Sequence, residues 1–329
     1  MLDPLFTALA SGGANLLQPA VLFFLLGALA ALARSDLALP RDAAKMLSLF
    51  LMLCIGFRGG VEARAHGLDA DFMRVAALGL GLSLALPFPA FALLRRTGVD
   101  RLTAAATAAH YGSVSVVTFA AAQSYLSSQG AAPDGFMSAV LAIMETPAIL
   151  VAVWIAAQGR GDRPIPEKTT PVWREVLFNG AGVLLIGSFL IGLVTGQAGE
   201  TRLHVVIGPV FQGALCFFLL DLGVTAATRW REAGRIPLRV LALGVVLPLF
   251  GAAVAGGLSI LAGLSPANAT ALIVLAASAS YIAAPAAMRL ALPQADAGLY
   301  LTLSLGVTFP FNLVIGIPLY HTVISALMR

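Results

Sequence analysis

The sequence predicts an all-α integral membrane protein: about ten transmembrane helices arranged as two inverted five-helix repeats, with broken helices in spans 4 and 9. Three observations predict this fold: an apolar composition, a series of long apolar segments, and a polar motif that recurs 165 residues later. Hydrophobic residues make up 59% of the chain and charged residues only 11%, whereas soluble domains carry roughly 25% charged residues. The mean hydropathy of +0.91 likewise excludes an ordinary soluble domain.

Apolar segments follow one another along the whole chain, each close to the roughly 20 residues that cross a bilayer core. The expected spans cover about residues 16–33, 43–57, 72–94, 102–127, 136–158, 176–196, 205–228, 240–262, 267–292 and 299–327. Because each half holds an odd number of spans, the second half must enter the membrane from the opposite face. The expected first repeat covers residues 1–158, a cytoplasmic linker covers 159–174, and the second repeat covers 175–329.

The positive residues orient the chain. If the N-terminus faces outward, 15 of the 20 Lys and Arg residues lie at the inner ends of spans or in inner loops, which is the bias seen in membrane proteins. We therefore expect a multi-pass protein of the cell (inner) membrane with both termini external.

The recurring motif interrupts spans 4 and 9. The segment Gly112-Ser113-Val114-Ser115 in the first half corresponds to Ala277-Ser278-Ala279-Ser280 in the second half. Serines next to β-branched residues favour a break in a helix, and each break would expose the N-terminus of a half-helix, whose free N–H groups bind anions. An isolated Ser-x-Ser more often bonds back to its own helix and aids packing. Its duplication at a fixed offset favours a transport site for a small oxyanion, with Tyr281 beside the second break as a lining residue.

Two proline motifs lie in the corresponding spans 5 and 10, around Pro147 and Pro310. Each proline frees a backbone carbonyl, and the nearby side chains of Glu145, Thr308 and Asn312 offer the oxygen ligands that a sodium ion prefers. The alternative for Glu145 is a protonated, hydrogen-bonded acid. The dispersed histidines do not predict a transition-metal site.

With these motifs, the chain resembles a divergent member of the sodium-dependent bicarbonate transporter family. The residues that carry the resemblance are Gly112, Ser115, Thr118, Glu145, Pro147, Ala276, Ala277, Ser278, Ser280, Pro285, Arg289, Pro293, Tyr300 and Pro310, together with residues 317–319. The resemblance covers nearly the whole chain apart from a shorter central loop. This chain departs from the family pattern at Tyr281, where the family has an acidic residue.

The resemblance implies a homotrimer that couples sodium entry to bicarbonate uptake, with a gate domain (spans 1, 2, 6 and 7) and a core domain (spans 3–5 and 8–10). It places Gly112, Ser113, Ser115, Thr118, Ser278 and Ser280 on the anion-binding motifs. No cofactor is expected beyond sodium as the coupling ion. A cytoplasmic regulatory protein is a further possible partner, and nucleic acid is not expected.

The leading interpretation is a secondary active transporter that imports a small anion by alternating access, with sodium-coupled bicarbonate symport as the first choice. One alternative is a proton- or sodium-coupled carrier of another small organic or inorganic anion. Another is a membrane receptor or scaffold that binds an anion without moving it. An enzyme is not predicted, because the chain lacks paired acids, an HExxH motif and a nucleophile with its base.

Overall fold

The computed structural model describes residues 18–37, 39–66, 70–158, 180–232 and 236–328. Within these residues every regular element is a helix and no strand occurs, so the all-α prediction is confirmed for the described part of the chain. The expected linker over 159–174 lies outside the described residues.

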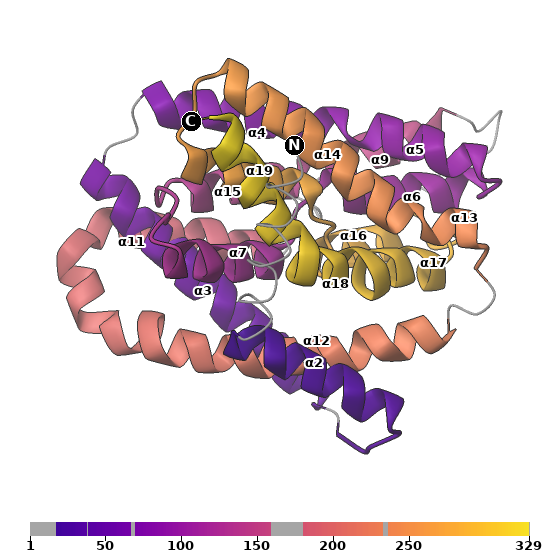
Figure 1. Cartoon of the computed structure of the whole chain (residues 1–329), viewed down its shortest axis with the longest axis horizontal. Coiled ribbons are helices and arrows are strands. Elements are labelled where there is room, and N and C mark those ends of the chain that lie inside the picture. The colour runs from indigo at the N-terminus through magenta and orange to yellow at the C-terminus, as the bar shows by residue number, and fades with distance from the viewer. Residues whose placement is uncertain (1–17, 38, 67–69, 159–179, 233–235, 329) are drawn as a thin grey trace.

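The first half consists of one long helix and several shorter ones (Figure 1). They are α2 (Pro19–Leu32), α3 (Arg41–His66), α4 (Ala70–Ala85), α5 (Pro87–Arg96), α6 (Arg101–Gly112), α7 (Val116–Ser128), α8 (Met137–Glu145) and α9 (Pro147–Ala157). Both α5 and α9 begin at a proline, a residue that suits the first helical position because its missing N–H needs no partner there.

The second half contains longer helices and three π-helical segments, η1, η3 and η4. In chain order it runs α11 (Gly180–Val205), η1 (Val206–Val210), α12 (Phe211–Glu232), α13 (Leu238–Leu241), α14 (Leu243–Leu261), α15 (Pro266–Ala277), α16 (Ala283–Ala291), α17 (Ala297–Leu301), η3 (Thr302–Thr308), α18 (Phe309–Phe311), η4 (Asn312–Gly316) and α19 (Ile317–Leu327). Such π-helical turns are rare and are frequent at functional sites.

Six helical stretches of the described residues are long and apolar enough to cross a membrane: Asp42–Ala65, Ala70–Arg96, Met137–Ala157, Val183–Arg231, Leu238–Leu261 and Ala297–Leu327. The fourth has 49 residues, which at about 1.5 Å per residue is enough for two crossings. Length and composition therefore agree with a multi-pass membrane protein but do not confirm the ten expected spans. One reason is physical: the breaks divide two expected spans into short pieces such as α6 and α15.

The helices before the two breaks match each other in length and in their ends. Helices α6 and α15 both have 12 residues. At their starts, the side chain of Asp100 accepts a hydrogen bond from the N–H of Thr103, and that of Ser265 accepts one from the N–H of Asn268. Side-chain oxygens at this position satisfy N–H groups that have no partner within the helix. The same local structure thus recurs at an offset of 165 residues.

Helices of the two halves are interleaved. The most extensive helix contacts join α3 to α11 and α2 to α12, and Figure 1 shows α12 along one edge of the molecule with α2 packed across it. Glycines permit the close approach: a Cβ added to Gly27 would collide with the carbonyl of Leu220, and one added to Gly192 would collide with that of Phe57. Small residues at such crossings are typical of membrane helix pairs.

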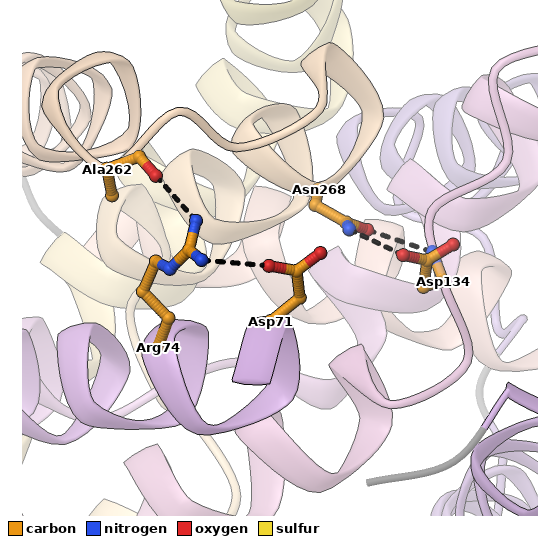
Figure 2. A network of polar contacts seen from close by, with 5 residues as sticks. All are labelled: Asp71, Arg74, Asp134, Ala262 and Asn268. Carbon is orange, nitrogen blue, oxygen red and sulfur yellow. Dashed lines mark hydrogen bonds and ion pairs between the residues drawn. The ribbon is translucent and has the colours of Figure 1, made fainter. Parts of the chain in front are cut away.

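Polar contacts also tie the ends of helices from opposite halves (Figure 2). Arg74 donates to the carbonyl of Ala262 at the end of α14 (2.9 Å) and pairs with Asp71 (3.2 Å). The Asn268 amide donates to the Asp134 carboxylate at 2.7 Å and accepts from the Asp134 N–H at 2.9 Å. The two halves are therefore joined by hydrogen bonds as well as by apolar packing.

Candidate functional site

The first break lies between α6 and α7. Helix α6 ends at Gly112, Ser113 is extended (φ −83°, ψ 170°), and α7 begins at Val116. The Ser115 Oγ accepts hydrogen bonds from the N–H (3.1 Å) and the hydroxyl (2.9 Å) of Thr118 and so caps α7. The predicted interruption of this helix is present.

The second break repeats this geometry. Helix α15 ends at Ala277, Ser278 is extended (φ −81°, ψ 166°), and α16 begins at Ala283. The Ser280 Oγ accepts from the N–H of Ala284 at 3.2 Å. All of the predicted serines are 3% exposed or less, so the polar groups of both breaks lie inside the protein. This burial is required, because a membrane protein does not expose unpaired polar backbone to lipid.

The two breaks contact each other directly. The N–H of Ser115 donates to the Ser278 Oγ (2.9 Å), and the N–H of Ser280 donates to the carbonyl of His110 (2.9 Å). The Ser278 Oγ in turn donates to the Leu275 carbonyl (2.8 Å). The two breaks, far apart in the sequence, are thus joined by hydrogen bonds in the protein interior. We call this buried contact between the two breaks the polar crossing.

Unpaired donors lie at the start of α7. The N–H groups of Val116 and Val117 have no hydrogen-bond partner among the described residues. They belong to the first turn of a helix, where free N–H groups and the helix dipole favour an anion.

A small cavity adjoins the break. It has a volume of about 10 Å³, and its lining includes Ser115, Ser280, Tyr281 and Glu145. That volume is about the minimum for a single water molecule. An anion therefore needs the site to open.

Tyr281 fills much of the space beside the crossing. It is 9% exposed, and its ring packs edge-on against Phe309 with centroids 5.3 Å apart. Its hydroxyl lies near the side chains of Ser115 and Thr118 but makes no hydrogen bond of good geometry with the described residues. Tyr281 also lines a second, much larger cavity, so its segment separates the small cavity from the large one.

The three residues expected to bind sodium lie in two places. Glu145, 2% exposed, lines the small cavity, and its carbonyl accepts from the Ser113 Oγ at 2.7 Å. Thr308 donates to the Gly244 carbonyl (2.6 Å), and Asn312 donates to the Ala277 carbonyl (2.8 Å). No hydrogen bond joins Glu145 to Thr308 or Asn312 in the described structure.

Gly112 has a steric role at the first break. A Cβ at this position would lie 2.5 Å from Cγ of Pro87 and 2.7 Å from Cβ of Ala148. The end of α6 is thus packed tightly between α5 and α9.

Some residues of the site have no counterpart in the sequence analysis. Tyr111 hydrogen-bonds to Thr308 (2.8 Å) and Tyr320 to Asn312 (2.9 Å). Ser83 donates to the Met144 carbonyl (2.8 Å) and accepts from the Ala148 N–H (3.3 Å). Its hydroxyl thus pairs with backbone groups on both sides of Pro147, where the helix is interrupted. A lone serine in an otherwise apolar segment was the available signal for Ser83.

The large cavity, of about 1260 Å³, lies between two groups of helices. One wall comes from α3, α11 and α12, and the other from residues 281–283, α16, α17 and η3. Among the described residues, three charged side chains line it: Lys45, Asp221 and Arg289. Among the residues that the structure describes, no group of three or more His, Cys, Asp or Glu is placed to hold a metal ion.

Comparison with known protein families gives a match over most of the chain. The family model described as the Na⁺-dependent bicarbonate transporter superfamily matches residues 19–325, nearly the whole chain. No curated protein matches the chain.

Proposed function

The chain belongs to the Na⁺-dependent bicarbonate transporter superfamily, and from this premise we propose that it is a secondary active transporter that imports a small anion together with sodium. Bicarbonate is the first substrate to test. The observation that carries the proposal is the buried crossing in which Ser115 bonds to Ser278 and Ser280 bonds to His110. Paired helix breaks of this kind in the two halves of a membrane protein are typical of transport sites.

In the proposed cycle the anion docks at the start of α7, on the free N–H groups of Val116 and Val117. The hydroxyls of Ser115 and Ser280 add donors, and that of Thr118 does so after it releases the Ser115 Oγ, to which it donates here (2.9 Å). Gly112, Ser113 and Ser278 hold the breaks in place. Tyr281 must move, because the cavity of about 10 Å³ leaves no room for the anion.

We assign sodium binding to Glu145 first. Thr308 and Asn312, whose side chains bond to Gly244 and Ala277 in this structure, would have to move toward Glu145 to serve as further oxygen ligands. Glu145 makes no ion pair with the described residues, and an uncompensated carboxylate inside a membrane protein is costly. A bound sodium ion would offset the charge of the Glu145 carboxylate and so remove its repulsion of the anion, which makes binding of each ion favour binding of the other.

Alternating access follows from two inverted five-helix repeats. We assign α2, α3, α11 and α12 to a gate domain and the remaining helices to a core domain, with both termini outside the cell membrane. The interleaved packing of the four gate helices and the large cavity between them and the core support this division. The resemblance further implies a homotrimer and a cytoplasmic regulatory protein.

The test is uptake of radiolabelled bicarbonate into proteoliposomes with and without an inward sodium gradient. We expect uptake with the gradient and little without it, and we expect Ser280→Leu to abolish uptake. Ser259→Leu in α14 is a control for a bulky side chain at a buried serine outside both breaks. Equal uptake with and without sodium contradicts sodium coupling.

A proton-coupled carrier is the second candidate, favoured by the isolated carboxyl of Glu145 in the small cavity. Uptake driven by an inward proton gradient without sodium, and lost in Glu145→Gln, would select it. Binding of the anion in a thermal-shift assay without any flux would instead indicate a receptor.

A further inference from the structure

The large cavity is out of proportion to a small inorganic anion. Its volume is about 1260 Å³, whereas pockets for drug-sized ligands occupy roughly 300–1,000 Å³. Bicarbonate would fill a small fraction of it. The cavity therefore has room for a ligand with a sizeable body.

Its walls are mainly apolar. Leu49, Leu53, Phe57, Phe218 and Leu305 all line it, from α3, α12 and η3. Pockets of this composition gain affinity from removing apolar ligand surface from water and gain specificity from a few polar groups.

The charged groups of the lining have a positive balance. Lys45 and Arg289 are exposed, and neither has a carboxylate within salt-bridge distance among the described residues. The acid, Asp221, lies near the backbone of Leu39. The Arg289 guanidinium lies near the Tyr300 hydroxyl, and its planar set of N–H donors suits a carboxylate.

An unsatisfied hydroxyl in the lining is an independent sign of a ligand. Ser48 is 6% exposed, and its Oγ has no hydrogen-bond partner in the described structure. Buried polar groups in proteins are nearly always hydrogen-bonded. An unpaired Ser48 beside an apolar cavity indicates a site that is completed by a bound molecule.

We propose that this cavity binds an amphipathic organic monoanion, a carboxylate with an alkyl or aryl body, with the carboxylate at Arg289 and the body against Leu53, Phe218 and Leu305. Lys45 adds positive potential. A ligand in this position lies between the two helix groups and keeps them apart. If the proposed transport function holds, it inhibits anion uptake; the binding itself does not depend on that function.

The binding test uses the whole protein in phosphatidylcholine nanodiscs, with octanoate as the probe and calorimetry as the readout. Empty nanodiscs correct for partition into lipid. We expect saturable binding of octanoate, no binding of octylammonium, and affinity that rises about fourfold for each methylene from butyrate to octanoate, which corresponds to roughly 0.8 kcal/mol per buried methylene.

Matched variants locate the site. A Cβ added to Gly187, which lines the cavity, meets nothing within 4 Å, so Gly187→Leu fills space without a clash at the backbone. Gly257 in α14 is equally open and does not line the cavity, which makes Gly257→Leu the control. We expect Gly187→Leu and Arg289→Gln each to weaken octanoate binding about tenfold or more, Arg289→Lys to restore part of it, and Gly257→Leu to leave it unchanged.

Several results would overturn the proposal: equal affinity for acetate and octanoate, octanoate binding that is unaffected by Gly187→Leu, or a phospholipid or the chain's own N-terminal segment seen in the cavity. The measurement of bicarbonate uptake is independent of this binding test. Octanoate that binds as expected to a protein without bicarbonate uptake would refute the proposed function and leave this site intact.

Discussion

The N–H of Ser115 donates a hydrogen bond of 2.9 Å to the Oγ of Ser278, so the helix break of one half is held by a serine of the other. Both residues are almost fully buried. A buried hydrogen bond between the two breaks couples their movement, because separating them would leave the Ser115 N–H without an acceptor. Coupled movement of two half-helices is what a shared binding site requires.

Replacing Ser278 by alanine tests this coupling. The variant leaves the Ser115 N–H without an acceptor, which should lower the free energy of unfolding by about 1–3 kcal/mol and reduce anion uptake strongly. Ser278→Thr keeps a hydroxyl and should retain more activity. Ser259→Ala is the matched control, because the buried Ser259 Oγ has no partner in the described structure. Thermal unfolding and uptake would be measured in parallel, and equal effects of Ser278→Ala and Ser259→Ala would refute the coupling.

The tight packing at Gly112 predicts a steric effect. Gly112→Ala places a methyl group 2.5 Å from Pro87 and should destabilise the protein by about 1–3 kcal/mol, as overpacking does. Gly81→Ala in α4 meets nothing within 4 Å and should be neutral or slightly stabilising, since alanine favours helix. Melting temperatures in one detergent compare the two. A Gly112→Ala protein as stable as Gly81→Ala would show that the break is loosely packed.

Glu145 should determine the response to sodium. Glu145→Gln keeps the shape of the side chain and removes its charge, so the sodium concentration for half-maximal uptake should rise by about tenfold or more, the effect of losing one charged ligand. Uptake would be measured across a sodium series at fixed anion concentration. Glu62→Gln, on α3 at the exposed pair with Arg58, is the control. An unchanged sodium response would remove Glu145 from the cation site.

The helix cap at Asp100 predicts a dependence on pH. Partial burial alone would raise the pKa of Asp100, but hydrogen bonds from Thr103 and Leu102 and the nearby Arg95 lower the pKa below its usual value. The carboxylate therefore stabilises the fold above its unfolded-state pKa, and this contribution is lost as the pH falls through the lower folded-state pKa.

Asp100→Ala should cost about 1 kcal/mol at neutral pH, and so should Ser265→Ala at the equivalent cap of α15. Only the Asp100 effect should shrink in acid, because serine does not titrate. Thermal unfolding of both variants from neutral to acidic pH checks this. A difference between wild type and Asp100→Ala that is the same at every pH would contradict the charged cap.

Local signals in the sequence were sufficient to predict the breaks. The serine motifs 112–115 and 277–280 define both interruptions because hydroxyl groups next to a helix end compete for its backbone groups. The contacts of Tyr111 with Thr308 and of Tyr320 with Asn312 were not predictable, since side-chain pairing between distant spans depends on packing that no local pattern encodes. The number of helical stretches long enough to cross a membrane also differs from the ten expected spans. One cause is that a helix with a break appears in the sequence as a single apolar segment.

The placement of Tyr281 shows the same limit. Its position after the second break was evident, and so was its departure from the family pattern. That its ring would pack on Phe309 and divide a water-sized space from a large cavity followed only from the three-dimensional arrangement of η3 and α18 around it.

The pairing of α2 with α12 and of α3 with α11 bears on how the protein is made. The ribosome releases α2 and α3 before α11 and α12 exist, so for part of synthesis neither helix can pack against its later partner. The α3–α11 pair can form once the chain up to residue 205 has emerged, and the α2–α12 pair once the chain up to residue 232 has emerged. The nascent chain must therefore persist as an open intermediate, and this is the stage at which insertases and quality-control proteases would encounter it.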